Sequence, residues 1–305
     1  MRRMVAFGSL VLAGLAAGAQ LVAQGAATAP VPAPAKKAMF WRVSSGEKVA
    51  WLLGSIHLGS KGMYPLPKEM EDAFQRSTAL LVEIDINHVD LGKMQMLVFQ
   101  TGLYGGDETL WDHVSPETRQ RLEAFCEKYG LPAMAMSKMK PWAAAMMVST
   151  LPLMKSGMEM NLGIDKYFLD KAEKANKRVV EIESADEQMK LVSGITAEML
   201  EKSVAASAQQ DPEEYGKRLQ QAWMRGDAGQ MEKIMREQTS DAVEFAKAMV
   251  EDRNLHMADA AEQFLKGKEQ AFVVVGAGHM VGPGGVVRIL EKRGYKVEQV
   301  AIGGR

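Results

Sequence analysis

Two segments that lie far apart in the chain share one local pattern, an apolar run that ends in Gly-x-x-His. The first is Val49-Ala-Trp-Leu-Leu-Gly-Ser-Ile-His57, and the second is Ala271-Phe-Val-Val-Val-Gly-Ala-Gly-His279. A short apolar run bounded by glycine is typical of a strand that is buried on both faces. Open α/β sheets bind ligands at the carboxyl ends of such strands. The pattern therefore predicts an α/β fold that brings His57 and His279 together.

A third predicted strand, from Ala79 to Ile86, carries the acidic residue Glu83. A carboxylate inside such a strand must be paired, hydrogen-bonded or bound to a metal. Two histidines and one carboxylate match the three protein ligands of a catalytic metal site that keeps one position open for water. The alternative is that each histidine is a strand-end residue bonded to backbone, because a single Gly-x-x-His motif is short and common. The residues by themselves leave both interpretations open.

The rest of the chain predicts one α/β domain over residues 39–305. A hairpin leads to His57, a last strand follows His279, and helices are expected between the strands. From about residue 196 to residue 268 the pattern is helical throughout, and we interpret this stretch as a large insertion. The expected fold is therefore a central mixed sheet with flanking helices and a helical insertion.

Charge and cysteine content exclude some classes of function. The 305 residues carry 37 basic and 38 acidic side chains, a net charge of −1, which gives no electrostatic case for a nucleic-acid partner. Cys126 is the only cysteine, so no disulfide can form within the chain, and we interpret it as a buried thiol. An exported form must therefore rely on its hydrophobic core for stability.

The amino terminus has the pattern of a targeting segment. Two arginines follow Met1, an Ala/Gly/Leu-rich apolar run extends to Ala23, and small residues come next. We interpret residues 1–28 as a signal peptide and residues 29–38, rich in Pro and Ala, as a flexible segment. The protein is then expected in the periplasm or outside the cell, with no stable membrane insertion after cleavage. An uncleaved anchor helix is the alternative.

The motifs, taken in order, resemble the TraB/GumN family, also called TraB/PrgY, whose animal members are the Tiki proteins. The resemblance covers most of the chain after the signal segment. Met280 stands where Leu usually follows the second histidine. The segments that carry the resemblance are Leu52 to Gly59, Leu80 to Asp85, Lys140-Pro-Trp142, Gly163-Ile-Asp165, Glu183 with Gln188, Arg253-Asn254, Val274 to Gly285, and Gly294 to Val297.

The resemblance implies a fold shared with erythromycin-esterase-like and ChaN-like proteins. The Tiki members resemble metal-dependent proteases that act on a secreted signalling protein, whereas bacterial members are associated with peptide-pheromone shutdown or with polysaccharide gene clusters. The resemblance thus implies an exported metal-dependent hydrolase of peptidase type, with a divalent ion (Mn, Co or Zn) and a peptide or protein substrate. The alternative is a non-catalytic periplasmic protein that sequesters a peptide, haem or another ligand in the same cleft.

The resemblance also implies roles for individual residues. His57 and His279 are metal ligands or catalytic acid/base residues, and Glu83 is the third ligand or the base that activates water. Arg253 is a candidate for stabilising an oxyanion, or it pairs with an acid on a neighbouring helix.

Two further sets of residues are expected to build the surroundings of this site. Glycine lets the backbone turn sharply and admit a substrate. The glycines expected to shape the cleft are Gly54, Gly276 and Gly278. Asp165 and Glu183 are expected to hold the scaffold.

Overall fold

The computed structural model describes residues 36–207, 211–239 and 250–303. The predicted signal peptide, residues 1–28, and most of the predicted flexible segment 29–38 lie outside these residues. The described residues belong to one compact unit, and its first strand begins at Lys37, just before the expected start of the domain. Among the described helices, none combines the length and the apolar composition that crossing a membrane requires.

Within the described residues, the strands form one mixed sheet in the order β4-β3-β5-β2-β1-β6. They are β1 (Lys37–Ser45), β2 (Lys48–Ser55), β3 (Ala79–Val82), β4 (Arg178–Glu181), β5 (Ala271–Gly276) and β6 (Lys296–Ala301). The neighbours β2, β5, β3 and β4 run parallel, whereas β1 is antiparallel to β2 and to β6. The mixed sheet expected from the sequence is therefore confirmed, and the carboxyl ends of the parallel strands meet at one edge.

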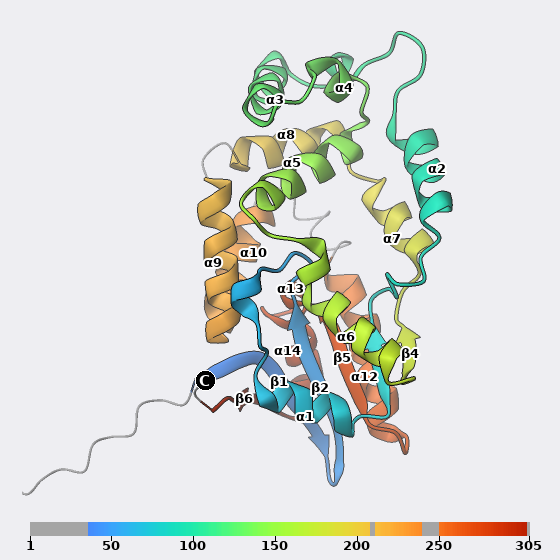
Figure 1. The fold of residues 1–305 in the computed structure, drawn as a ribbon, viewed down its shortest axis with the longest axis vertical. Helices are drawn as coiled ribbons and strands as arrows, with labels where there is room; N and C mark the ends of the chain where they lie inside the picture. The colour runs from blue at the N-terminus through green and yellow to red at the C-terminus, as the bar shows by residue number, and fades with distance from the viewer. Residues whose placement is uncertain (1–35, 208–210, 240–249, 304–305) are drawn as a thin grey trace, which may run out of the picture. The chain divides into compact units, whose positions relative to one another are not determined.

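Helices cover both faces of this sheet, with α1 and α6 in front of it and α12 and α14 behind it in Figure 1. The α-helices are α1 (Lys68–Arg76), α2 (Leu91–Gly102), α3 (Pro116–Tyr129), α4 (Ala133–Ser137), α5 (Pro141–Lys155), α6 (Ile164–Lys174), α7 (Ala185–Val192), α8 (Ala197–Ser207), α9 (Pro212–Arg225), α10 (Ala228–Thr239), α12 (Asp252–Lys266), α13 (Ala277–Met280) and α14 (Val286–Lys292). Short 3-10 turns are η1 (Lys61–Met63), η2 (Leu110–Asp112) and η3 (Met160–Leu162).

The core is centred on β5, whose residues from Ala271 to Val275 are all buried. The Phe272 ring lies 4.8 Å from Phe168 of α6 and 5.6 Å from Phe74 of α1, measured between ring centroids. Large aromatic side chains contribute most of the apolar area that a core removes from water. This cluster fixes α1 and α6 on the sheet and so sets the position of the loop between η3 and α6.

A second, smaller core lies in the helical part beyond the carboxyl edge of the sheet (Figure 1). It is built by α3, α4, α5 and α8 around Leu122, Met136, Val148 and Leu200. Within the described residues, the expected insertion at 196–268 is mostly helical, but its parts belong to different layers. Its first helix, α8, joins this second core, whereas α12 packs on β2 and β5. The helical part therefore combines segments from before and after β4.

Helix boundaries follow the capping signals, and one strand is shorter than predicted. Ser115 caps α3 through its hydroxyl, and Gly130 ends that helix with φ of 70°. The predicted strand over 79–86 was wrong in length, because β3 ends at Val82. Asp85 N–H donates to the Glu181 carboxylate at 2.7 Å, and this bond turns the chain out of the sheet. Glu83 thus lies just past the strand end.

Candidate functional site

His57 is held at the end of β2 by the loop that opens α6. Ile164 N–H donates to the Ile56 carbonyl at 3.0 Å, and His57 Nδ1 lies 3.0 Å from Asp165 Oδ2. A Cβ on Gly163 would come within 2.4 Å of the His57 carbonyl oxygen, so only glycine allows this approach. The His57 side chain remains 63% exposed. Asp165, expected to hold the scaffold, therefore orients the first histidine directly.

His279 is buried on the short helix α13, immediately after β5. Its Nδ1 lies 2.7 Å from Asn254 Oδ1, while the Asn254 amide nitrogen donates to the Gly284 carbonyl at 2.8 Å. Because the amide nitrogen of Asn254 donates to Gly284, the amide oxygen faces the His279 ring. That oxygen can only accept a hydrogen bond, so Nδ1 must carry the imidazole proton. His279 Nε2 is then left with its lone pair, which is the state that binds a metal or accepts a proton.

Glu83 lies between the two histidine segments because β3 pairs with β5. Its Oε1 accepts the Gly276 N–H at 2.6 Å, and its Oε2 accepts Arg253 at 2.7 Å and Gln188 at 3.1 Å. The residue is only 8% exposed. A buried carboxylate requires such partners to remain ionised. Of the three states expected for this carboxylate, Glu83 is both paired with a cation and hydrogen-bonded, and its role as a metal ligand stays a prediction.

A second, partly buried glutamate, Glu183, lies beside the first. Glu183 N–H donates to the Glu83 carbonyl at 3.0 Å, which continues the β3–β4 ladder and brings both side chains to the same edge. The Arg253 guanidinium bonds to both carboxylates at 2.7 Å, and the Gln188 amide donates to both as well. Arg253 thus pairs with acidic residues, as one alternative expected. These residues follow strands β3 and β4, whereas the alternative placed the acid on a neighbouring helix. Its charge offsets the repulsion between two adjacent carboxylates.

The two Gly-x-x-His motifs and Glu83 converge on Gly276. From the position that a Cβ on Gly276 would occupy, Glu83 Oε1 is 3.3 Å away, the His279 ring carbon Cδ2 is 3.5 Å away, and His57 Nε2 is 3.9 Å away. Cδ2 is the ring atom bonded to Nε2. A side chain at this position would fill the space between the three groups, so the glycine keeps that space open. The sequence prediction that these three residues share one place is consistent with this geometry.

The surroundings separate the protonation states of the three groups. Partial desolvation lowers the pKa of His57 although its side chain is 63% exposed, but the charge and hydrogen bond of Asp165, aided by Glu83, outweigh this effect and raise that pKa to about 9. Burial lowers the pKa of His279 to about 4, against the pull of Glu83. Burial alone would raise the pKa of Glu83, yet the histidines, Arg253 and the Gly276 N–H bring it down to about 2. At neutral pH, one imidazole is therefore charged and the other is neutral.

The donors at this site fit a divalent metal in their chemistry. Each histidine has its Nδ1 bonded to a side-chain oxygen, as metal-ligating histidines usually do. Arg253 pairs with Glu83 and Glu183, whereas Asp165 pairs with His57, so the three carboxylates exceed the single guanidinium by two negative charges when both imidazoles are neutral. Glu83 fits least well, because both of its oxygens already accept hydrogen bonds. Within the described residues, no three His, Cys, Asp or Glu side chains are already arranged as a metal-binding group.

A pocket of about 220 Å³ opens beside these groups. His57, Glu83, Asp165 and Gln188 contribute its polar side. The remaining wall is apolar apart from Ser55, and comes from Val82, Ile84, Ile86, Met160 and Val274. The site therefore offers both reactive groups and an adjoining apolar surface.

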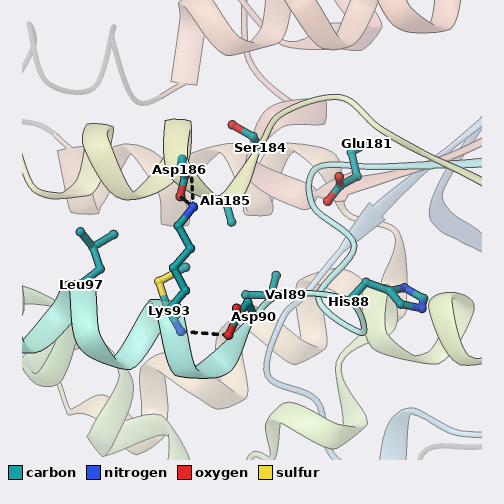
Figure 2. Close-up of a pocket in the computed structure, with 10 residues that line it drawn as sticks. His88, Val89, Asp90, Lys93, Leu97, Glu181, Ser184, Ala185 and Asp186 are labelled. Carbon is teal, nitrogen blue, oxygen red and sulfur yellow. Dashed lines mark hydrogen bonds and ion pairs between the residues drawn. The ribbon is translucent and has the colours of Figure 1, made fainter.

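Another pocket, between α2 and α7, is separate from this site (Figure 2). Lys93 of α2 reaches Asp186 of α7 at 2.8 Å, as Figure 2 shows, and His88 lies at the opposite end of the pocket. His88 Nδ1 is bonded to Asp85 Oδ2 at 2.8 Å, an arrangement like that of His57 and Asp165. The two pockets share no lining residue. His88 is thus a useful comparison for His57.

Two of the glycines expected to shape the cleft, Gly54 and Gly278, allow close packing of the backbone. A Cβ on Gly54 would lie 3.0 Å from the Ala277 backbone, and one on Gly278 would lie 3.0 Å from Met235 of α10. Both therefore allow α13 to pack closely, which places His279. Asn254 and Gln188 had no predicted role, although both lie in the segments that carried the resemblance. Asn254 contacts His279, which is 25 residues away in the chain, and Gln188 contacts Glu83, which is 105 residues away. The residues next to Asn254 and Gln188 in the sequence therefore do not indicate these contacts.

Comparisons with known proteins agree with this arrangement of motifs. A model of the TraB/PrgY/gumN family matches residues 39–299. Proteins named YbaP, from Shigella flexneri and Escherichia coli (strain K12), are each 29% identical over 147 residues, which is 48% of this chain and 53% of the relative. A Treponema pallidum (strain Nichols) protein is 22% identical over 276 residues, covering 85% of this chain and 81% of that protein. The alignments with the YbaP proteins thus span about half of each relative.

Proposed function

Because this chain belongs to the TraB/PrgY/gumN family, we propose that it is an exported metal-dependent hydrolase that cleaves peptide bonds. His57, Glu83 and His279 hold the divalent metal in this proposal. The observation that carries it is their convergence around Gly276, with both histidines oriented through Nδ1. A divalent metal at such a site lowers the pKa of a bound water toward neutrality and polarises a carbonyl.

The protonation states favour one set of roles for these residues. A general base works best with a pKa near the working pH, and the pKa of Glu83 is about 2, so we assign Glu83 as a ligand and not as the base. His279 is neutral at working pH and ready to bind through Nε2. His57 must lose a proton before it binds. We assign Arg253 a positioning role, because its guanidinium is bonded to both Glu83 and Glu183.

A non-catalytic binding protein is the second candidate function. The observation that favours it is that Glu83 already accepts Gly276, Arg253 and Gln188, so its charge is balanced without a metal. In that case the pocket beside His57 would take up a peptide, haem or another ligand and release it unchanged. Metal content and product formation separate the two candidates.

The test uses the purified mature protein, stripped with a chelator and titrated with Mn²⁺, Co²⁺ and Zn²⁺ by calorimetry. We expect one metal per chain, with affinity reduced sharply in His57→Ala and in His279→Ala. The double variant should resemble either single one, because an incomplete site loses little more when a second ligand is removed. His88→Ala is the matched control and should bind the metal like the unchanged protein. Full metal binding by His279→Ala, or additive losses, would contradict the shared site.

Turnover and location complete the test. Metal-loaded protein incubated with a mixed peptide library should release new amino termini, and the stripped protein should not. Stoichiometric uptake of a peptide or haem without product would favour the binding protein. Sequencing the amino terminus of the exported protein tests the proposed removal of residues 1–28, and an intact Met1 in the membrane fraction would point to an anchor.

A further inference from the structure

The pocket beside His57 has apolar side chains at its rim as well as in its floor. Met160 is 64% exposed and Ile86 is 41% exposed, and both line the pocket. Val82, the last residue of β3, and its strand partner Val274 in β5 are buried and line the inner part of the pocket. Exposed apolar side chains gathered around a concave site mark a binding surface more often than a chance cluster. These residues have no role in the proposed metal site.

The backbone fixes Met160 relative to His57. Gly59 and Glu159 exchange two hydrogen bonds, at 3.0 and 2.8 Å, so the segment after His57 pairs with the residue before Met160. Tyr64 adds a bond from its hydroxyl to the Leu162 carbonyl at 2.9 Å. A Cβ on Gly59 would overlap the Leu162 carbonyl oxygen, which shows how closely the two segments approach. The apolar rim is therefore held in place next to the reactive groups.

We propose that this pocket is a specificity site that binds one apolar side chain of a peptide, next to the bond facing His57 and Glu83. The proposal rests on the proposed function and adds the class of substrate. A volume of about 220 Å³ is below the range usual for whole ligands and suits a single side chain. Medium-sized aliphatic residues such as leucine and methionine match the aliphatic lining of Ile84, Ile86 and Met160. Acidic side chains fit this pocket poorly, because its aliphatic wall would remove a carboxylate from water without giving it a hydrogen-bond partner.

Binding can be measured without turnover by using N-acetyl amino acid amides as probes. The ¹³C-labelled methyl group of Met160 reports on the pocket, and its resonance is assigned with Met160→Leu. Titration with the leucine and methionine amides should shift this resonance, with affinity at least about tenfold higher than for the alanine amide. The aspartate amide should cause no shift in the same concentration range. Equal shifts for the leucine and aspartate amides, or none for any probe, would overturn the proposal.

A charge placed on the rim should reverse the preference. In Met160→Lys, the leucine amide should bind at least about tenfold more weakly and the glutamate amide should gain affinity, observed through the Ile84 methyl groups. Met134→Lys is the matched control, because Met134 is 71% exposed on α4 and does not line this pocket. It should leave both affinities unchanged. An unaltered preference in Met160→Lys would remove Met160 from the site.

The outcome for this pocket can be distinguished from the outcome for the proposed hydrolase. If the apolar probes bind as expected but no peptide is cleaved and no metal is taken up, the specificity site stands and the hydrolase fails. If peptides are cleaved with equal rates whether leucine or aspartate adjoins the bond, the hydrolase stands and the specificity site fails.

Discussion

The Asn254 side-chain oxygen lies 2.7 Å from Nδ1 of His279, and both residues are buried. The Asn254 amide is itself held by the Gly284 carbonyl, so its orientation does not depend on the histidine. An acceptor fixed in this way keeps the proton of His279 on Nδ1 and leaves Nε2 available toward Gly276. One asparagine thus determines which ring nitrogen of His279 can bind a metal or accept a proton.

We predict that Asn254→Leu lowers metal affinity by about 10- to 100-fold, because the partner that orients a ligand is lost. The same change should lower the free energy of unfolding by about 1–3 kcal/mol, since the buried ring of His279 and the Gly284 carbonyl lose their hydrogen-bond partner. Asn254→Asp keeps an acceptor for the ring and should recover part of the metal affinity. Calorimetric titration and urea denaturation measure the two effects. Unchanged metal affinity in Asn254→Leu would mean that Asn254 has no positioning role.

Much of the site could be predicted because its parts have local signals. Gly-x-x-His after an apolar run, and a glutamate inside a third apolar run, can each be recognised from neighbouring residues alone. The meeting of His57 with His279 then follows from parallel pairing of β2 with β5. The hairpin that leads to His57 could be predicted for the same reason.

What could not be predicted depends on contacts between distant residues. Asp165 reaches His57 across 108 residues of chain, and Arg253 reaches Glu83 across 170. Such pairs have no spacing rule. The end of β3 at Val82 was missed because Ile84 and Ile86 have strand-forming side chains, while the Glu181 carboxylate bonds to Asp85 N–H and turns the chain. Tertiary hydrogen bonds overrode the local preference there.

We predict that Gly163→Ala destabilises the fold by about 1–3 kcal/mol, because the added methyl group forces the backbone apart. Its Cβ would lie 2.4 Å from the His57 carbonyl oxygen, which cannot move without shifting the histidine. Metal affinity should fall in parallel. Gly105→Ala is the control, since no atom lies within 4 Å of its Cβ, and the unfolding free energy should change little. Urea denaturation of both variants is the measurement, and equal stability would refute the steric argument.

The pH dependence of stability should show a maximum near pH 6.5 for protein kept in chelator. The folded-state pKa of His57 is about 9, above its ordinary value of 6.5, so the folded state binds more protons and stability falls as pH rises from 6.5 to 9. The folded-state pKa of His279 is about 4, so stability falls as pH drops from 6.5 to 4. Glu83, at about 2 against 4.5, adds a further loss below pH 4.5.

Denaturant unfolding measured from pH 4 to pH 9 tests these signs. Asp165→Asn removes the carboxylate that raises the His57 pKa, so the loss between pH 6.5 and 9 should become smaller in this variant. The loss of stability between pH 6.5 and pH 4 should change less in this variant. A curve that keeps its full alkaline loss in Asp165→Asn would contradict the assignment of that loss to His57.

Stability should not depend on reductant. Cys126 is buried in the second core between α3 and its neighbours, and burial raises the pKa of its thiol, so the reactive thiolate is scarce. We expect equal melting temperatures with and without dithiothreitol, and slow reaction of the native protein with iodoacetamide. A reductant-dependent shift together with a covalent dimer on a denaturing gel would show that Cys126 is accessible after all.

We predict that removing Arg253 lowers the free energy of unfolding, because Arg253 is paired with both Glu83 and Glu183. Arg253→Met leaves Glu83 and Glu183 adjacent, buried and without their shared cation, and breaking such a buried pair costs about 3–5 kcal/mol. Arg253→Met combined with Glu183→Gln should recover part of this loss, because only one carboxylate then remains to be balanced. Arg218→Met is the comparison, since the Arg218–Glu237 pair is about 30% exposed and such pairs contribute about 0–1 kcal/mol. Urea denaturation at pH 7 measures all three variants. If the double variant is less stable than Arg253→Met alone, repulsion between the two glutamates is not the cause, and Arg253 stabilises the site through packing instead.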